Sequence, residues 1–87
     1  MKARVFVTLK PSVFDPQGNT ISEALHSLGY DAVVDVRQGK YFELDLKVHG
    51  RADAERIASE VASRVLANPV IESFRIEVTE GTPGGRP

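Results

Sequence analysis

The sequence contains few side chains whose types and spacing match a known catalytic or metal-binding arrangement. His26 lies in an expected helix and His49 follows an expected strand, and neither has further metal ligands at a recognised spacing. Glu43 and Asp45 share one strand face, whereas the paired carboxylates of glycosidases oppose each other across a cleft. Cysteine is absent, which excludes thiolate nucleophiles, thiolate metal sites and disulfides. We predict no catalytic residue and no metal site.

Glycine-rich phosphate loops and serine nucleophile elbows are also absent from the sequence. No Walker or dinucleotide-binding glycine pattern occurs, and no serine lies in a G-x-S-x-G turn. These motifs supply the backbone N–H groups or the strained serine on which those chemistries depend. We therefore expect this chain to bind no cofactor.

Two cations flank a glycine at the point where the chain is expected to reverse. Gln38-Gly39-Lys40 is short enough for a tight hairpin with Gly39 at the positive-φ position. Arg37 and Lys40 would then lie on one protrusion. A solvated basic turn is the simpler interpretation; the alternative is a docking tip on which Arg37 holds a carboxylate of another chain.

The elements that position these residues follow from hydrophobic periodicity. Apolar residues alternate in the strands and recur at helical spacing in the helices. The expected order is a strand (4–9), a helix (16–28), a strand (32–37), a strand (41–48), a helix that Asp53 caps and Asn68-Pro69 ends, and a strand (71–78). The expected apolar stripes are Ile21, Ala24, Leu25 and Leu28 in the first helix, and Ile57, Ala58, Val61 and Val65 in the second.

The start of the first helix has two candidate signals. Asp15 can act as N-cap before Pro16, because the missing N–H of proline has no helical partner at that position. Thr20 and Glu23 form a competing capping box. We favour Asp15-Pro16, with Gly18 as a tolerated weak point and Gly29 as the positive-φ residue after the helix.

The order β-α-β-β-α-β predicts an α+β, ferredoxin-like two-layer sandwich. Two right-handed crossovers would place both helices on one face of a four-stranded antiparallel sheet, in the order fourth, first, third, second. We expect residues 1–80 to form this single domain and the Gly/Pro-rich residues 81–87 to be a disordered tail. The second strand would be an exposed edge, which invites pairing with another chain and favours a homo-oligomer.

The sheet face without helices would carry charges of both signs and two aromatic rings. Antiparallel sheets often face water, so a solvated face is favoured over a polar interface with aromatic anchors. Its expected residues are Arg4, Phe6, Thr8, Tyr41, Glu43, Asp45, Lys47, Ser73, Arg75 and Glu77.

Charge and hydropathy exclude several classes of partner. A formal net charge of −1 argues against a nucleic-acid partner, since phosphate contacts need a basic surplus. No apolar run approaches the roughly 18 residues that span a bilayer, and no charged leader precedes the first strand. We expect a cytoplasmic protein that contacts neither nucleic acid nor membrane.

Several segments resemble one known family. They are Val5-Phe6-Val7-Thr8-Leu9-Lys10, Asp15-Pro16-Gln17-Gly18, Ala24-Leu25-His26-Ser27-Leu28-Gly29-Tyr30 and, most specifically, Asp35-Val36-Arg37-Gln38-Gly39-Lys40-Tyr41-Phe42-Glu43-Leu44. Together they resemble the PurS family, the small subunit of phosphoribosylformylglycinamidine synthase in purine biosynthesis. The similarity extends to about Val78.

This resemblance implies a required but non-catalytic subunit. A PurQ-type glutaminase subunit would release ammonia, and a PurL-type synthase subunit, which holds ATP and Mg²⁺, would convert formylglycinamide ribonucleotide to the amidine. The present chain would associate with itself as a dimer or tetramer, bridge the two other subunits and help to shield the ammonia path. With the resemblance, we interpret Arg37, Gly39 and Lys40 as partner-binding residues.

Other functions of the same fold remain alternatives. A small-molecule sensor of the amino-acid-binding (ACT) type rests on the fold alone. An RNA-recognition domain needs aromatic rings on the open face of its inner strands; Tyr41 and Phe6 fit this, whereas Phe42 points to the other face. A phosphatase of the acylphosphatase type is disfavoured, because no glycine-rich phosphate loop follows the first strand.

Overall fold

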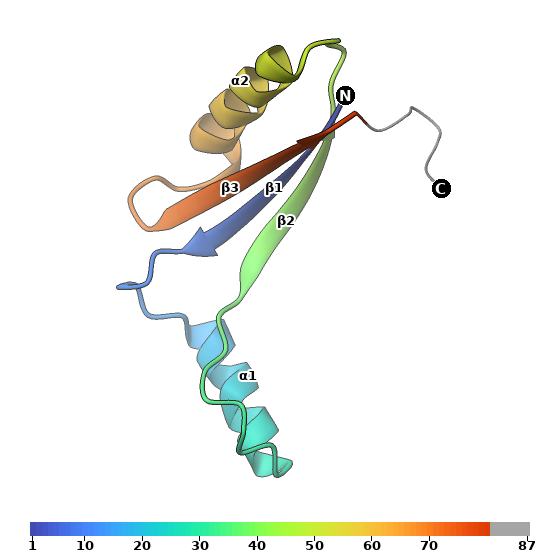
Figure 1. Cartoon of the computed structure of the whole chain (residues 1–87). Helices are drawn as coiled ribbons and strands as arrows, with labels where there is room; N and C mark the ends of the chain where they lie inside the picture. The colour runs from blue at the N-terminus through green and yellow to red at the C-terminus, as the bar shows by residue number, and fades with distance from the viewer. Residues whose placement is uncertain (81–87) are drawn as a thin grey trace.

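The computed structural model describes residues 1–80, which form three strands, two α-helices and one short π-helix (Figure 1). The predicted tail, residues 81–87, lies outside the described residues. The elements are β1 (Lys2–Leu9), α1 (Pro16–Ser27), β2 (Gly39–Asp45), α2 (Arg51–Val61), η1 (Ala62–Leu66) and β3 (Glu72–Thr79).

The sheet is antiparallel, with β1 in the centre and the order β2-β1-β3. This order agrees with the prediction for these three strands. Phe6 of β1 lies opposite Tyr41 of β2 and Arg75 of β3, so these residues share one face. Val5 and Val7 point to the other face and are fully buried, which confirms the period-two pattern of the first strand.

The prediction of a four-stranded ferredoxin-like sheet is wrong for residues 1–80 of this chain. Residues 33–38 form no helix and no strand; they lead directly into β2. The predicted hairpin at Gln38-Gly39-Lys40 does not form, because the chain does not reverse there. Within the described residues, β1 is the single strand beside β2. Strand β1 pairs with β2 on one side and with β3 on the other. The predicted fourth strand would therefore have paired with the outer edge of β2.

Helix α2 covers the inner face of the sheet through small side chains. Ala54, Ala58 and Ala62 are fully buried and lie four residues apart, which places them on one side of the helix. They pack against the valines of β1 and Val78 of β3 in two adjoining clusters. The predicted stripe was partly wrong, because alanine at the contact lets the helix lie close to the sheet. Ile57 and Val61 are half-buried, and Val65 is exposed.

The ends of α2 also differ from the prediction. The N-cap is Gly50, and Asp53 lies inside the first turn, where its negative charge favours the helix dipole. At the other end the chain widens into η1 before Ala67, which is buried against β1. In β3, Phe74, Ile76 and Val78 share the inner face, opposite Val7, Val5 and Ala3 of β1. Phe74 is nevertheless 37% exposed.

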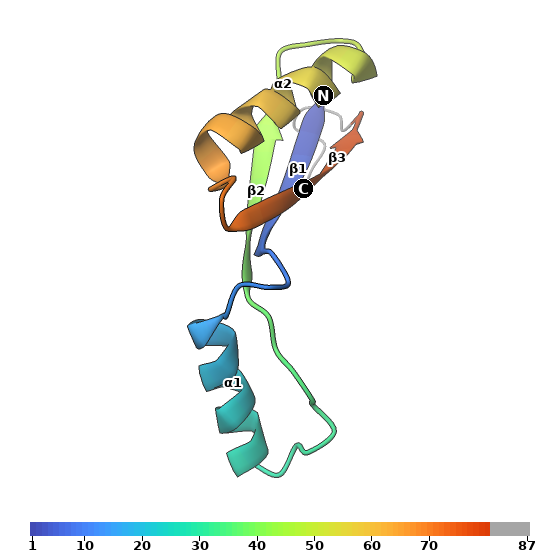
Figure 2. The ribbon, with the colours of Figure 1, turned by 90° about the vertical axis from the view of Figure 1, so that its left-hand side faces the viewer.

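Helix α1 begins as predicted but does not cover the sheet. Asp15 is its N-cap and Pro16 its first residue, and Gly29 follows it with a φ of 94°. The helix extends away from the sheet, and residues 28–38 return alongside it (Figures 1 and 2). The prediction of two helices on one sheet face is therefore wrong, because only α2 lies on that face.

The molecule consequently has two parts. We call the sheet with α2 and η1 the body, and α1 with residues 28–36 the arm; residues 10–15 and 37–39, which join them, are the neck (Figure 2). The radius of gyration is 16.4 Å, against about 12 Å for a compact domain of this length. No helix in the described part of the chain has the length and hydropathy to cross a bilayer.

Candidate interaction surfaces

Asp15 ties the two strands of the neck together. Its Oδ1 accepts a hydrogen bond from the N–H of Gly18 at 2.8 Å, and its Oδ2 accepts one from the N–H of Gln38 at 2.7 Å. These bonds, led by that from Gln38, and the charge of Arg37 hold the pKa of Asp15 below its usual value, although burial acts in the opposite direction. One carboxylate therefore caps α1 and fixes the start of β2 beside it.

Arg37 completes this clamp from the other connection. Its Nη2 donates to the carbonyl oxygens of Lys10 at 3.0 Å and Val13 at 2.8 Å. The N–H of Lys10 in turn donates to the carbonyl of Ile71 at 2.8 Å, which anchors the neck to the start of β3. The guanidinium thus binds carbonyls of its own chain, so its immediate role in this structure is to position the arm.

Gly39 and Lys40 lie at the start of β2 rather than at the tip of a hairpin. Gly39 is opposite Thr8 and does not have a positive φ, so that part of the prediction is wrong. A Cβ there would lie 2.5 Å from the carbonyl oxygen of Val7, so glycine is required by close approach instead of turn geometry. Lys40 Nζ lies 3.5 Å from a carboxylate oxygen of Glu72 on β3.

A hollow of about 330 Å³ opens where the neck meets the body. Val7 and Leu9 form its apolar floor, Pro16 borders it from α1, and Lys40 and Glu72 place opposite charges on it. The hollow occupies the part of the inner sheet face that α2 does not cover. Its volume lies near the lower end of the range for small-ligand sites, and helical side chains would also fit there.

The arm packs on its own return segment with its small residues. Gly18 and Ser22 are buried, and a Cβ on Gly18 would lie 2.2 Å from the carbonyl oxygen of Val36. Gly18, which was predicted to weaken the first turn of the helix, therefore allows the helix to lie close to the return segment. The predicted apolar stripe lies elsewhere on the helix: Ile21 is 41% exposed and Leu28 is 73% exposed.

Large apolar side chains continue this exposed surface along the arm. Tyr30 and Val34 are exposed on the return segment, Val34 to 87%, and Phe14 is exposed at the neck. An apolar surface of this kind on a small domain indicates a contact with another protein surface. We call Ile21, Ala24, Leu25, Leu28, Tyr30 and Val34 the arm surface.

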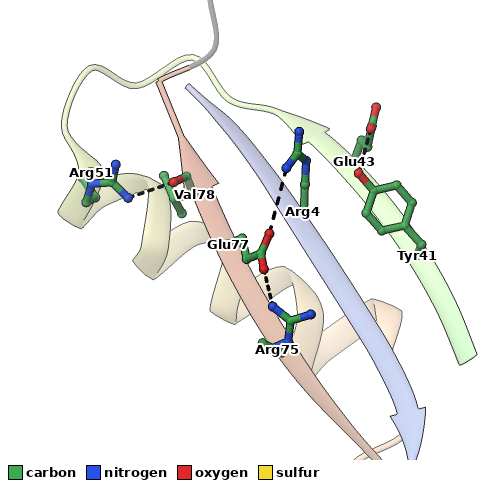
Figure 3. Close-up of polar contacts among 7 residues, drawn as sticks. All are labelled: Arg4, Tyr41, Glu43, Arg51, Arg75, Glu77 and Val78. Atoms are coloured by element: carbon green, nitrogen blue, oxygen red, sulfur yellow. Dashed lines mark hydrogen bonds and ion pairs between the residues drawn. The ribbon is translucent and has the colours of Figure 1, made fainter.

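The open face of the sheet is a second candidate surface. The Phe6 ring lies between the Tyr41 ring, at 5.1 Å between centroids, and the Arg75 guanidinium, 4.2 Å above it. Glu77 contacts Arg75 and lies 4.0 Å from Arg4 (Figure 3). These cations are already paired within the face, as a solvated sheet surface would have them.

Tyr41 and Glu43 extend this network onto β2. The phenol O–H of Tyr41 donates to Glu43 Oε2 at 2.7 Å (Figure 3). This hydrogen bond, together with partial desolvation and the negative charge of Glu43, raises the pKa of Tyr41 above its ordinary value. Both side chains are exposed, so they can contact another chain.

The titratable residues do not assemble into a reactive centre in the part of the chain that the structure describes. No three His, Cys, Asp or Glu side chains among residues 1–80 are close enough together to hold a metal ion. The ring of His26 lies with Nε2 2.6 Å from the carbonyl oxygen of Val33, so this histidine ties α1 to the return segment.

Sequence reasoning missed the double role of Asp15 and the clamp made by Arg37. The cap on α1 was visible from the Asp-Pro pair, but the bond to Gln38 joins residues 23 apart. The partners of Arg37 lie 27 and 24 residues away. No local sequence pattern marks such contacts, because their partners are distant in the chain.

Comparison with known proteins gives one consistent result. Residues 2–80 match the family model described as PurS, phosphoribosylformylglycinamidine (FGAM) synthase. A phosphoribosylformylglycinamidine synthase subunit PurS from Bacillus subtilis is 48% identical over 79 residues, which are 91% of this chain and 93% of that protein.

Solved structures agree with the sequence match. PurS of Methanocaldococcus jannaschii, described as one of the subunits of formylglycinamide ribonucleotide amidotransferase, has a TM-score of 0.84 at 32% identity, covering 93% of this chain and 98% of that one. A chain in a structure of PurLQS from Thermotoga maritima has a TM-score of 0.80 at 28% identity, covering 87% of this chain and 93% of that one. On the match over residues 2–80 and the identity to these relatives, this chain belongs to the PurS family.

Proposed function

We propose that this chain is the non-catalytic small subunit of phosphoribosylformylglycinamidine synthase in purine biosynthesis, acting in the cytoplasm. The observation that carries the proposal is the family match over residues 2–80 together with a 48% identical relative that is named as this subunit.

The partners that we propose are a PurL-type synthase subunit and a PurQ-type glutaminase subunit. Support comes from the similarity of this chain to one in a structure described as PurLQS. ATP and Mg²⁺ would belong to the synthase subunit. This chain would bind surfaces of both partners and hold the two active sites in a fixed relation.

The physical benefit of such a bridge lies in the chemistry of ammonia. Ammonia is small and neutral, and it is readily protonated in water at neutral pH, which removes its nucleophilic lone pair. A passage closed to bulk solvent between the glutaminase and synthase sites therefore preserves the reactive form. A rigid small subunit supports that passage by fixing the orientation of the larger chains.

Self-association is the second part of the proposal. The arm surface exposes Ile21, Leu28 and Val34 to solvent in a single copy, which a small soluble domain rarely does without a partner. The molecule is elongated, with extents of 48 × 33 × 15 Å, so much of its chain does not pack in a core of the same copy. We therefore propose that the functional unit contains at least two copies of this chain.

We further propose that Arg37 and Gly39 of the neck, together with the adjoining Lys40 of β2, lie at a contact with a partner subunit. Arg37 and Lys40 have exposed side chains, and Gly39 and Lys40 border the hollow beside them. The neck also fixes the direction of the arm, so changes there alter any surface that spans body and arm. Both effects would weaken assembly of the complex.

The test is reconstitution of the complex from purified subunits. This chain is mixed with the synthase and glutaminase subunits in the presence of glutamine and ADP or ATP, and size-exclusion chromatography and glutamine-dependent amidine formation are measured. A ternary peak and activity that requires this chain support the proposal. Full glutamine-dependent activity without it, or retention of RNA or an amino acid by the isolated chain, would favour the alternative of a sensor or RNA-binding module.

Two variants and one matched control examine the neck. Arg37→Ala and Lys40→Glu should weaken ternary co-elution about tenfold while circular dichroism shows a folded chain. Arg56→Ala removes a cation of α2 whose ion pairs, among residues 1–80, are with Asp53 and Glu60 of the same helix, so it should assemble normally. Unchanged co-elution and activity in both neck variants would contradict the assignment.

A further inference from the structure

The outer edge of β3 carries backbone groups that no other strand of residues 1–80 occupies. The sheet order β2-β1-β3 makes β3 an edge strand, on the opposite side of β1 from β2. Arg51 Nη1 donates to the carbonyl oxygen of Val78 at 2.8 Å (Figure 3), so this carbonyl points away from β1. In an antiparallel strand, outward-facing residues alternate with residues that are paired to the neighbouring strand. The N–H and C=O groups of Phe74 and Ile76 therefore also face outward.

Contacts within the same copy close both ends of this edge. At the start of β3, the N–H of Glu72 donates to the carbonyl of Asn68 at 2.7 Å. At the other end, the Arg51 guanidinium occupies the last outward carbonyl. Between these contacts, the outward groups of Phe74 and Ile76 have no hydrogen-bond partner among residues 1–80. Their alternating donors and acceptors fit the extended backbone of an added strand.

A pocket lies beside the first of these residues. It has a volume of about 290 Å³, and Ala67, Pro69 and Phe74 supply its apolar wall. The Phe74 side chain is 37% exposed there, although it belongs to the inner face of the sheet. We call this the β3 pocket. A strand that paired with the edge could place one large apolar side chain in it, as peptides bound to sheet edges do.

The charges of the β3 pocket favour an acidic group next to that apolar side chain. Glu72 borders the pocket, but its carboxylate already lies 3.5 Å from Lys40 Nζ and accepts the N–H of Asn68 at 2.7 Å. Lys10 borders it too, and the ion pairs formed among residues 1–80 do not include Lys10. The unpaired ammonium group is complementary to a carboxylate of another chain.

A second copy of this chain fits the edge poorly. Two-fold pairing of β3 with itself, centred on the free groups, would place Phe74 opposite the second copy's Ile76 and Arg75 opposite the second copy's Arg75. Like charges that lie directly opposite each other destabilise an antiparallel pair. A shift of the centre by one residue brings in Glu72 or Val78, each of which already uses one outward backbone group. The edge therefore favours a chain of different sequence.

We propose that residues 73–77 of β3 receive an extended segment of a different protein, which adds a strand to the outside of the sheet. The segment binds the outward N–H and C=O groups of Phe74 and Ile76. It places an apolar side chain in the β3 pocket and a neighbouring carboxylate on Lys10. The inference rests on the proposed function, from which we take the synthase subunit as the source of the segment, and it specifies how this chain holds that subunit.

Amide hydrogen exchange at single-residue resolution tests the added strand. The natural chain is compared alone, with each purified larger subunit, and with both in the presence of glutamine and ADP. The N–H groups of Phe74 and Ile76 should exchange about tenfold more slowly once the synthase subunit is bound. The N–H groups of Arg75 and Glu77, which face β1, should be slow with and without it. This alternation is specific to a strand added at the outer edge.

Three variants separate the backbone contacts from the pocket. Phe74→Pro removes an outward N–H, a change that an edge strand tolerates, whereas Phe74→Ala removes the ring and keeps the N–H. Lys10→Ala removes the unpaired cation. Each should weaken binding to the synthase subunit about tenfold in calorimetric titrations, with the largest loss in Phe74→Pro and folding checked by circular dichroism. Arg56→Ala is the matched control for Lys10→Ala and should bind normally, because its ion pairs lie within α2.

The outcomes separate this inference from the proposed function. If the complex forms while Phe74 and Ile76 exchange as fast as in the free chain, the added strand is wrong and the proposed function stands. Slow exchange of both amides in the free chain, caused by a second copy or by residues 81–87, would also overturn the inference. Protection by the glutaminase subunit alone would overturn the assignment to the synthase. If no complex forms at all, the proposed function fails and this inference fails with it.

Discussion

The body and the arm each contain an α-helix of similar length, but only the body helix buries its apolar side within the same copy. In α2, Ala54, Ala58 and Ala62 are fully buried against the sheet. In α1, the buried positions are Gly18 and Ser22, whereas Ile21 is exposed and Leu25 is only half-buried. The body is therefore stabilised by a core of its own, whereas the arm is held in place by polar contacts at its base.

This difference separates what makes the chain fold from what makes it associate. Burial of one large apolar side chain contributes about 1.5–3 kcal/mol, and the arm leaves Ile21 and Leu28 largely outside any core. The hydrogen bonds of the neck fix the position of these side chains, but they do not supply the free energy that burying them would contribute. Changes in the body should therefore lower the stability of a single copy, and changes in the arm surface should lower association.

The largest contrast should come from placing the same charge on each helix. Ala58→Glu puts an ionised carboxylate where α2 meets the sheet, and we expect it to destabilise the body by about 4 kcal/mol, close to the total stability of a small domain. Urea unfolding and circular dichroism would measure this loss.

The matched change in the arm is Ala24→Glu, on the exposed stripe of α1. At low protein concentration its unfolding midpoint should equal that of the natural chain, while its apparent mass by light scattering should fall to that of a monomer. Equal destabilisation by Ala24→Glu and Ala58→Glu would remove the distinction between the two parts.

A smaller effect is expected where body and neck meet. Gly39→Val places side-chain atoms against the carbonyl of Val7, where a Cβ alone would be 2.5 Å away, so β2 must shift away from β1. We expect a loss of about 1–3 kcal/mol in urea unfolding. Gly50→Ser is the control: it has open space around its Cβ and adds a capping hydroxyl to α2, so it should cause no loss.

Most of the body could be predicted from the sequence because its signals are local. Alternation of Val5 and Val7 predicted β1, and the Asp15-Pro16 pair predicted the first residue of α1. The choice of α2 contact residues was less accurate, since a stripe of alanines is weaker in hydrophobicity than the neighbouring Ile57 and Val65. The sequence does not show that closeness to the sheet favours the smaller side chains.

The position of the arm could not be predicted, because the same local pattern is compatible with two folds. A glycine between alternating segments indicates a hairpin, yet here Gly39 allows close contact with β1 in an extended chain. Whether residues 38–40 reverse or continue depends on Asp15 and Arg37 contacts between segments more than 20 residues apart. Hydrophobic periodicity is the same in both forms, so it predicts the segments and not their placement.

A moderate effect should follow from removing the carboxylate at the neck. Asp15→Ala loses the cap of α1 and the acceptor for the N–H of Gln38, and we expect the melting temperature to fall by about 5 °C. The loss should be larger than for Asp53→Ala, because Asp53 makes no cap hydrogen bond in the first turn of α2. Melting curves by circular dichroism provide the measurement; an equal fall in the two variants would contradict the clamp.

The same carboxylate should make the neck sensitive to acid. The pKa of Asp15 is lower in the folded chain than its ordinary value of 3.8, so the folded state favours the ionised carboxylate over the protonated one. Its stabilising contribution is complete above pH 3.8 and is lost as the pH falls through the lowered folded pKa. Asp15→Asn cannot titrate there, so its stability should change less between pH 4 and pH 2, about the range where carboxyl groups ionise.

The smallest effect is expected on the open face of the body, where the interactions are exposed. The pKa of Tyr41 is raised because its O–H donates to Glu43, so the protonated phenol is favoured in the folded chain. This contribution is present below the ordinary pKa of 10.0 and is lost as the pH rises through the higher folded pKa. Glu43→Gln should lower the Tyr41 titration midpoint, followed by NMR of the ring, towards its ordinary value with little change in melting temperature. If Glu43→Gln also abolished self-association, the open face and not the arm surface would hold the second copy, because only the open face contains this pair.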